Sequence, residues 1–398
     1  MIVFYNPHVD DFLAEPPHFR LLKRRALKKY GFVIDQTLQE SGQLHVVIDG
    51  TVSAFIPEYY FSMLPRFLRA WISQAEFACW KRINGLGGKV VRIDPPSGDH
   101  SGSVLLMFSY KGATGRLFPE RVATLSIFPA VLVHLSHYFI STSEKSANLS
   151  QLKNVWLAGD SDISTNPYFQ HFFVWYHKPF LVLPFAVAQR FEVRKPFTER
   201  EARCIATGSF HNLDEEVPRS CYEDFQRFFN LNTYHPVRKL IHEQAAATGG
   251  ALVSHVSPYR RKAEGGWIKR WLNHFSVTQK AYFSIDMVDL YNRYRFAVVG
   301  EELSGFPALG AFEAMACGSI LIADPKYYSG FGFEPGVHYL THDGCVDGII
   351  AAMHGGAGVD RALEGVAEAG RMFVENNFRP ESAYIKWRAV IEKVIAGD

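Results

Sequence analysis

The chain of 398 residues has little that would assign it to a specialised structural class. Its five cysteines are scattered and odd in number, and no two of them form a Cys-x-x-Cys pair. We therefore expect neither a structural zinc site nor a disulfide framework, and this cysteine usage fits a reducing cytoplasm. Basic and acidic residues number 42 and 40, a balance that argues against a dedicated nucleic-acid-binding protein.

One charge-free run requires a test for a membrane span. Residues 122–143 carry no formal charge over 22 positions, a length that would cross a bilayer. Because Pro129 and several Ser, Thr and His residues interrupt the run, the sequence favours a buried helix followed by a buried strand at 137–141. Peripheral contact with a membrane stays open. The first residues, MIVFYNPHVDDF, lack the positive region and cleavage site of a secretory signal peptide.

What the chain does have is enough apolar material for buried cores, with 47% hydrophobic, 21% charged and 14% aromatic residues. Short apolar runs alternate with helix-length segments, a pattern typical of parallel α/β sheets. We expect strands at residues 3–5, 45–48, 89–93, 104–108, 137–141, 155–158, 180–185, 204–207, 251–256, 296–299 and 319–323. We expect helices at residues 64–79, 236–248, 286–294, 307–317, 346–353, 359–375 and 380–395.

The best linker candidate is the polar segment EVRKPFTEREAR, because the strand–helix pattern restarts after it. We therefore predict an α/β fold of two Rossmann-like domains that face a cleft. Residues 1–195 form the first domain, and residues 196–380 form the second. A final helix at 381–398 is expected to pack back on the first domain.

The most informative segment is GEELSGFPALGAFEAMACGSILIA, residues 300–323. A polar, glycine-containing loop follows a strand, and Pro307 stands where a first helical turn would begin. Free N–H groups at such a helix start form an anion site. Glu313 lies on the flank of the apolar helix face, where its carboxylate needs a hydrogen-bonding partner, and ribose hydroxyls could serve. The alternative is a Glu exposed to solvent.

This segment resembles the nucleotide-sugar site of glycosyltransferases with the two-domain GT-B fold. LPFAVAQRF resembles their interdomain junction, ATGSF their first second-domain strand and glycine loop, and RPESAYIKWRAVIEKV their returning helix. That family usually has two Glu eight positions apart, whereas Glu302 and Glu313 are eleven apart. The resemblance implies that the first domain lies on the acceptor side and that the second binds the nucleotide-sugar. It implies nucleotide and phosphate binding by Gly208, Ser209, Glu302, Ser304, Gly305, Phe306, Pro307 and Glu313.

More closely, the chain resembles the retaining β-Kdo transferase domain of bacterial O-antigen biosynthesis enzymes. The resemblance implies a CMP-β-Kdo donor and a lipid-linked O-antigen or lipopolysaccharide saccharide as acceptor. It also implies a cytoplasmic enzyme, with contact at the inner membrane and membership of a longer multidomain chain as open alternatives. Another GT-B transferase or an epimerase with a UDP- or GDP-sugar, and a non-catalytic carbohydrate- or nucleotide-binding module, remain alternative functions.

Retention by double displacement needs a carboxylate nucleophile. In the Kdo transferase family this is an Asp early in the second domain, and the matching segment FFNLNTYHPVRK has Asn232 at that position. An amide has the shape of a carboxylate without its charge, so the resemblance implies an impaired variant. Alternatively, Asn232 is a loop residue that caps the helix beginning near Pro236.

Asp160, in LAGDSDIS, follows the last strong strand of the first domain and is the candidate general acid/base or acceptor ligand. The alternative is a turn Asp bonded to its own backbone. Although Asp160 and Asp162 have the Asp-x-Asp spacing of metal-dependent transferases, we expect no essential metal and no cofactor besides the donor. In SPYRRKAEGGWIKRW, Arg260 and Arg261 are candidates for the sugar carboxylate and phosphate. A solvated basic loop or contact with anionic lipid is the alternative.

Overall fold

The computed structural model describes residues 1–10, 12–14, 28–94, 100–213, 219–258, 285–355 and 360–397. It divides into two compact units, Met1–Ala186 with Pro380–Asp398, and Val187–Arg379. The sequence placed this division after residues 195 and 380. The structure places it earlier because the linker belongs to the second unit, where the Arg194 N–H donates to Asn292 Oδ1 at 2.7 Å. Arg260 and Arg261 lie outside the described residues.

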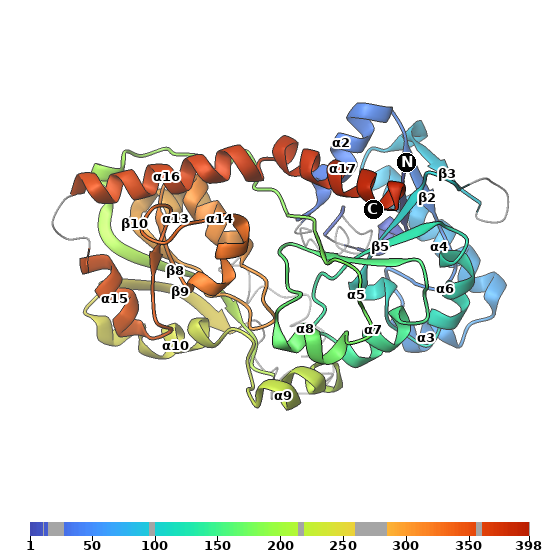
Figure 1. Cartoon of the computed structure of the whole chain (residues 1–398), viewed down its shortest axis with the longest axis horizontal. Helices are drawn as coiled ribbons and strands as arrows, with labels where there is room; N and C mark the ends of the chain where they lie inside the picture. The colour runs from blue at the N-terminus through green and yellow to red at the C-terminus, as the bar shows by residue number, and fades with distance from the viewer. Residues whose placement is uncertain are drawn as a thin grey trace. The chain divides into compact units, whose positions relative to one another are not determined.

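The amino-terminal unit is built on a seven-stranded parallel sheet with strand order β3-β2-β1-β4-β5-β6-β7 (Figure 1). Its strands are β1 (Ile2–Tyr5), β2 (Leu44–Val47), β3 (Val90–Arg92), β4 (Val104–Phe108), β5 (Ala130–His134), β6 (Val155–Gly159) and β7 (Leu181–Val182). Every residue of β4 and β5 is buried, as expected for a parallel sheet covered on both faces. Its helices are α2 (Gly31–Ser41), α3 (Glu58–Ser62), α4 (Arg66–Ile83), α5 (Ser109–Gly112), α6 (Phe118–Leu125), α7 (Thr142–Leu149), α8 (Pro167–Phe172) and α17 (Pro380–Ala396).

The predicted strand at 137–141 is wrong. The strand of this region is β5, and residues 137–141 form turns and bends before α7. His137 and Ser141 have φ values of 49° and 51°, in the left-handed region, so the chain cannot run extended through them. The predicted helix at 64–79 is confirmed as α4, with Pro65 just before its first turn.

Helix α17 completes the core of the amino-terminal unit. The Trp387 side chain is fully buried, and its indole lies parallel to the His134 ring at a centroid distance of 5.9 Å. Its Nε1–H donates to the Pro184 carbonyl at 2.7 Å, so the polar edge of the indole is satisfied within the core.

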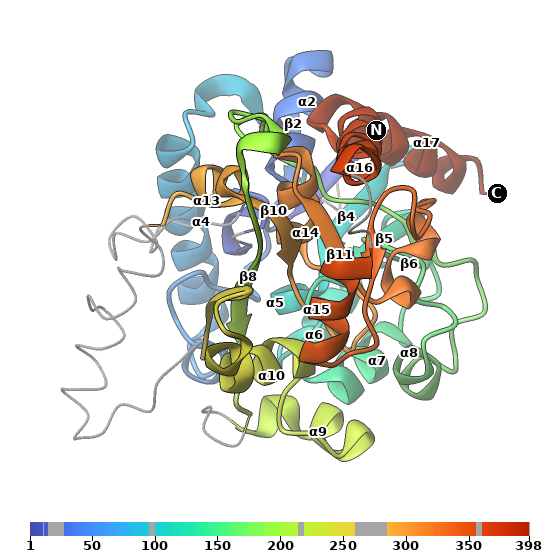
Figure 2. The same cartoon turned by 90° about the vertical axis from the view of Figure 1, so that its left-hand side faces the viewer.

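The carboxyl-terminal unit has a five-stranded parallel sheet with order β12-β11-β10-β8-β9, and Figure 2 shows β8, β10 and β11 in this order. Its strands are β8 (Glu201–Phe210), β9 (Leu252–Pro258), β10 (Tyr294–Val298), β11 (Ile320–Ala323) and β12 (Leu340–Thr341). Its helices are α9 (Glu223–Phe229), α10 (Pro236–Gln244), α13 (Met287–Arg293), α14 (Leu309–Ala316), α15 (Val346–Gly355) and α16 (Asp360–Phe378). The predicted α/β class with two Rossmann-like units is confirmed.

Two local predictions around the expected phosphate site need correction. Gly208 and Ser209 do not form a loop, because they continue β8 and pair with Val256 and Ser257 of β9. The helix expected from Pro307 begins at Leu309, so Pro307 lies just outside it.

In both sheets the strand order reverses at one point, between β1 and β4 in one unit and between β8 and β10 in the other. Connections leave such a point toward opposite faces of the sheet. The loops after the two strands therefore diverge and leave room for a ligand at the carboxyl ends of the strands. These two points are where a site is expected in each unit.

Candidate functional site

The loop at residues 300–306 follows β10 at the reversal point of the carboxyl-terminal sheet. It is closed by its own backbone, since the Gly305 N–H donates to the Glu302 carbonyl at 3.0 Å and the Glu302 N–H to the Phe306 carbonyl at 3.4 Å. Gly305 has a φ of 100°, a conformation that favours glycine. The Leu303 N–H donates to the Tyr234 carbonyl at 3.1 Å, which ties the loop to the segment before α10.

Arg238, in the first turn of α10, places a buried guanidinium beside this loop. Its Nη1 donates to the Ser209 carbonyl of β8 at 2.8 Å, whereas its Nε is buried and has no hydrogen-bond partner among the described residues. The Arg238 side chain occupies space that is open because two neighbouring residues are glycines. A Cβ at Gly208 would lie 2.9 Å from Arg238 Nε, and one at Gly300 would lie 3.0 Å from Arg238 Cγ.

His235, the residue just before α10, presents a second unsatisfied group. Its side chain is buried, and neither ring nitrogen has a hydrogen-bond partner within the described residues. Burial, and then the nearby charge of Arg238, hold the pKa of His235 well below its usual value. The neutral ring can therefore donate from one nitrogen and accept at the other.

The carboxylates of the loop differ in burial. Glu301, which the sequence analysis did not single out as a site residue, is 4% exposed, and burial raises its pKa to about 7. Its Oε1 accepts the Asp324 N–H at 3.4 Å. Glu302 is half-buried, with Oε2 3.4 Å from Ser304 Oγ and Oε1 3.7 Å from His235 Nε2. The site thus combines a fixed positive charge with a carboxyl that exchanges a proton near neutral pH.

Asn232 lies in the segment that leads into α10. Its Oδ1 accepts a hydrogen bond from Lys239 Nζ at 3.3 Å, and its carbonyl accepts the Leu213 N–H at 2.8 Å. The residue at the cap position of α10 is His235, and no side chain caps that helix. The interpretation of Asn232 as the helix cap is therefore wrong. A carboxylate at this position would face the Lys239 ammonium, which favours the charged form.

Glu313 is half-buried in α14, and burial raises its pKa to about 7, opposed by the charge of Arg190. Its charge also acts on the Cys317 thiol, whose pKa is raised to about 12, mainly by burial. Within the described part of the chain, no hydrogen bond or ion pair joins Glu313 to the loop at 300–306. Phe306, the last residue of the loop, and Pro307 are both buried, and their side chains offer no polar group to the site.

Asp160 belongs to the amino-terminal unit, at the end of β6. It is buried and paired: Oδ2 lies 2.5 Å from Lys29 Nζ, and Oδ1 accepts the Tyr30 hydroxyl at 2.8 Å. His134 Nε2 lies 3.9 Å from the same carboxylate. Asp160 is therefore not a turn residue bonded to its own backbone, whereas Asp162 is, since it accepts the Ser164 N–H at 2.8 Å.

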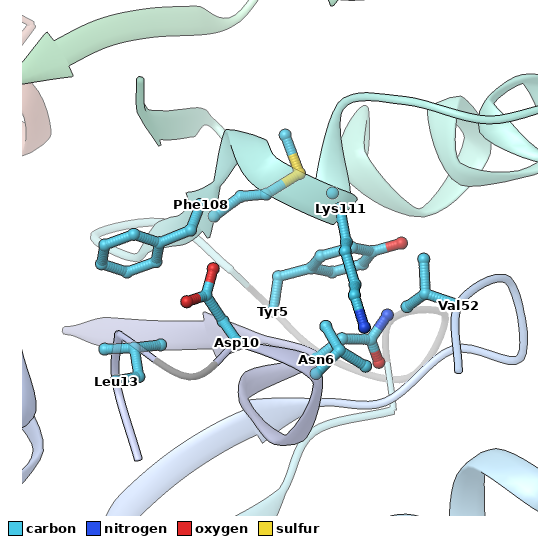
Figure 3. Close-up of a pocket in the computed structure, with 10 residues that line it drawn as sticks. Tyr5, Asn6, Asp10, Leu13, Val52, Phe108 and Lys111 are labelled. Carbon is cyan, nitrogen blue, oxygen red and sulfur yellow. The ribbon is translucent and has the colours of Figure 1, made fainter. Parts of the chain in front are cut away.

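The reversal point of the amino-terminal sheet has a small pocket, lined mainly by residues at the ends of β1 and β4 and in the segments that follow them (Figure 3). Asp10 points into the space beside Phe108 and Tyr5, and Lys111 extends toward Asn6. The pocket has an accessible volume of about 10 Å³, which is enough for one water molecule and too small for a sugar ring.

The described residues contain neither a cluster of metal ligands nor a membrane-spanning helix. No three His, Cys, Asp or Glu side chains gather there as a metal ion would require. No described helix is long and apolar enough to cross a membrane.

No protein-family model matches the sequence, and no match to a curated protein was found. Among solved structures, the fold is similar to sucrose-phosphate synthase from Thermosynechococcus elongatus, with a TM-score of 0.52 at 13% identity over 100% of this chain and 99% of that chain. HepE from Anabaena in complex with UDP and glucose matches with a TM-score of 0.48 at 9% identity, over 98% of this chain and 99% of that chain. A glycosyltransferase from Rickettsia africae matches with a TM-score of 0.47 at 10% identity, over 100% of this chain and 99% of that chain.

These identities show the fold alone, and the two matches below a TM-score of 0.5 carry no argument. What the first match establishes is a GT-B-like fold of two α/β units, each with a parallel sheet. The activity has to be argued from the residues of the site.

Proposed function

We propose that the chain is a glycosyltransferase whose carboxyl-terminal unit binds the phosphate of a nucleotide-sugar donor between α10 and the loop at 300–306. One observation carries this proposal: Arg238 Nε and both ring nitrogens of His235 are buried beside this loop without partners among the described residues. Buried polar groups are normally satisfied. Arg238 Nε and the protonated ring nitrogen of the neutral His235 are both donors, so they call for a ligand with acceptor oxygens. A phosphate supplies such oxygens and the negative charge that a guanidinium prefers.

The proposed donor is CMP-β-Kdo, and the proposed acceptor is a lipid-linked O-antigen or lipopolysaccharide saccharide. Both rest on the resemblance of the sequence to retaining β-Kdo transferases. The same resemblance supports a cytoplasmic enzyme. Arg260 and Arg261 keep their proposed role toward the sugar carboxylate and phosphate, and Glu302, Ser304 and Gly305 keep theirs toward the nucleotide. For Gly208 and Ser209 we propose a narrower role, since they shape and hold Arg238.

In a retaining mechanism of two displacements, the residue at position 232 would have to act as the nucleophile. A carboxylate oxygen there bonds to the anomeric carbon while the bond from that carbon to the phosphate oxygen breaks, and CMP leaves with the electron pair. The acceptor oxygen then bonds to the anomeric carbon, the carboxylate leaves, and the acceptor proton passes to a base. Asn232 offers an amide, a weak nucleophile, so we propose that this chain binds donor but transfers it poorly.

The identity of the nucleotide is tested by thermal shift with CMP, UDP and GDP. We expect stabilisation by CMP and a loss of about 10- to 100-fold in affinity for Arg238→Gln, the cost of one charge-assisted hydrogen bond. Arg227→Gln, on the exposed surface of α9, is the matched control and should bind as the parent does. If UDP or GDP stabilises instead, a different donor is correct. If no nucleotide stabilises, the donor-site proposal fails.

The nucleophile position is tested with Asn232→Asp. We expect transfer to rise by orders of magnitude and a covalent sugar adduct, detected by intact mass after incubation with CMP-β-Kdo, to map to residues 225–240. Asn230→Asp adds the same charge two positions away, at an exposed residue, and should leave activity unchanged. Unchanged transfer in Asn232→Asp would sink the assignment.

A non-catalytic binding module is the second candidate function, and Asn232 is the observation that favours it. Nucleotide binding without transfer in both Asn232→Asp and the parent chain would support the module. For the enzyme we propose that no metal is essential. A chelator should leave transfer by Asn232→Asp intact, and loss of transfer restored by manganese would overturn this.

A further inference from the structure

Several large apolar side chains of the amino-terminal unit are exposed within one short segment. They lie in the loop before α3, in α3, in the turn that follows it and at the start of α4, and they are Phe55, Tyr59, Tyr60, Met63, Phe67 and Trp71. The Phe67 and Trp71 side chains are 76% and 67% exposed. Isolated exposed apolar residues are ordinary, but six within 17 positions form a patch, and such patches mark contact surfaces.

Helix α4 has its apolar residues on both faces. Its inner face buries Phe77 and Trp80. The outer face carries Phe67, Trp71 and Ala75 at helical spacing, where a solvated helix would carry charges. Beside this face lies an open groove of about 270 Å³, which continues the apolar surface and is lined by Phe55, Ile56, Trp71, Ile72, Ala75, Glu76 and Cys79. In Figures 1 and 2, α4 lies at the periphery of its unit.

The charge around the patch is mainly positive. Residues 58–94 contain six basic side chains, of which Arg69 is buried and bound to Glu120, and three acidic ones, Glu58, Glu76 and Asp94. Glu76 is buried and accepts the Ser53 hydroxyl and the Ala54 N–H, so it contributes little to the surface. Arg66 and Arg82 are exposed near the two ends of α4, and the Arg116 guanidinium lies 5.1 Å from the centre of the Tyr59 ring.

We propose that α3 and the outer face of α4 form a surface that lies on an anionic lipid bilayer. Tyr and Trp side chains favour the level of the headgroups, where the ring is buried and the polar atom stays hydrated. Phe67 and Met63 would reach the acyl boundary, and the arginines would meet the lipid phosphates. A second copy of this chain fits the surface less well. In a two-fold contact through the same patch, Arg66 and Arg82 would face basic side chains of the other copy, and like charges repel.

The test is co-sedimentation of the full chain with vesicles, a readout that needs neither donor nor acceptor. We expect binding to phosphatidylglycerol–phosphatidylethanolamine vesicles, and weaker binding to phosphatidylcholine vesicles and in high salt. The double variant Phe67→Ser/Trp71→Ser should lose about tenfold or more in partitioning, since both side chains would leave the interface. Arg66→Glu should lose at least about fivefold on the anionic vesicles.

The control is Val174→Ser/Ile385→Ser, which removes two apolar side chains that are 72% and 68% exposed elsewhere on the same unit. It should bind vesicles as the parent does, and unchanged thermal unfolding should accompany both double variants. The proposal is overturned if Phe67→Ser/Trp71→Ser binds as tightly as the parent, or if the parent does not bind anionic vesicles. It is also overturned if the parent is a dimer that this double variant dissociates.

Discussion

Replacing Glu301 by Gln tests the electrostatics of the candidate site through stability. The carboxyl group is buried, and burial raises its pKa from 4.5 to about 7. The folded protein therefore holds this proton more tightly than the unfolded chain does. The stability that this group contributes is full below about pH 4.5 and is lost as the pH rises through 7, because the folded state must then bury a charge.

The size of the effect follows from that shift. One pKa unit corresponds to about 1.4 kcal/mol, so a rise from 4.5 to about 7 removes about 3 kcal/mol from the free energy of unfolding between pH 4.5 and pH 8. The amide of Glu301→Gln cannot ionise, yet it can still accept the Asp324 N–H. At pH 8 the variant should melt about 10 °C above the parent, and the difference should shrink toward pH 5.

The assay is thermal unfolding of both proteins from pH 5 to pH 8.5. Because a two-unit chain need not unfold in one step, hydrogen exchange at the amides of β10 gives a local readout of the same free energy. Glu364→Gln removes an exposed carboxylate of α16 and should follow the parent at every pH. A constant difference between Glu301→Gln and the parent across this range would refute the reasoning.

Three further substitutions test contacts within the two units. Gly208→Ala should cost about 1 to 3 kcal/mol of stability and weaken nucleotide binding, because φ is 116° there and a Cβ would lie 2.9 Å from Arg238 Nε; unchanged binding by calorimetry would contradict this. Asp160→Ala should cost about 3 kcal/mol in urea unfolding, because it leaves the Lys29 ammonium largely buried without its carboxylate, and a loss below about 1 kcal/mol would argue against a structural ion pair. Trp387→Ala should cost about 3 to 5 kcal/mol and lower exchange protection first in β5, and earlier loss in β10 would contradict the assignment of α17.

The sequence predicts the strand–helix alternation well wherever an apolar run coincides with one buried strand, as at β4 and β10. It misplaces β5 because two apolar runs adjoin there, and only the positive φ values of His137 and Ser141 decide which is extended. It ends β8 too early because glycine usually marks a turn, whereas Gly208 stays paired with β9.

The candidate site is less predictable than the fold. The loop at 300–306 has a sequence signature, and the position of Asn232 follows from a family resemblance. The buried Arg238 side chain, whose Nε has no hydrogen-bond partner among the described residues, has no local signature. Its place depends on two glycines, Gly208 and Gly300, that the folded sheet brings together from distant positions. The raised pKa of Glu301 is likewise a property of burial, and its neighbour Glu302 looks the same in the sequence.

The place of α17 in the chain has a consequence for synthesis. The carboxyl-terminal unit is continuous, and its two ends meet, since the Val187 N–H donates to the Phe378 carbonyl at 2.7 Å. It can therefore close as soon as it has left the ribosome. The amino-terminal unit is made first, but its core lacks Trp387 until the last helix emerges. Of the two units, the amino-terminal one is thus translated first, yet its core is completed only after the whole carboxyl-terminal unit has been made.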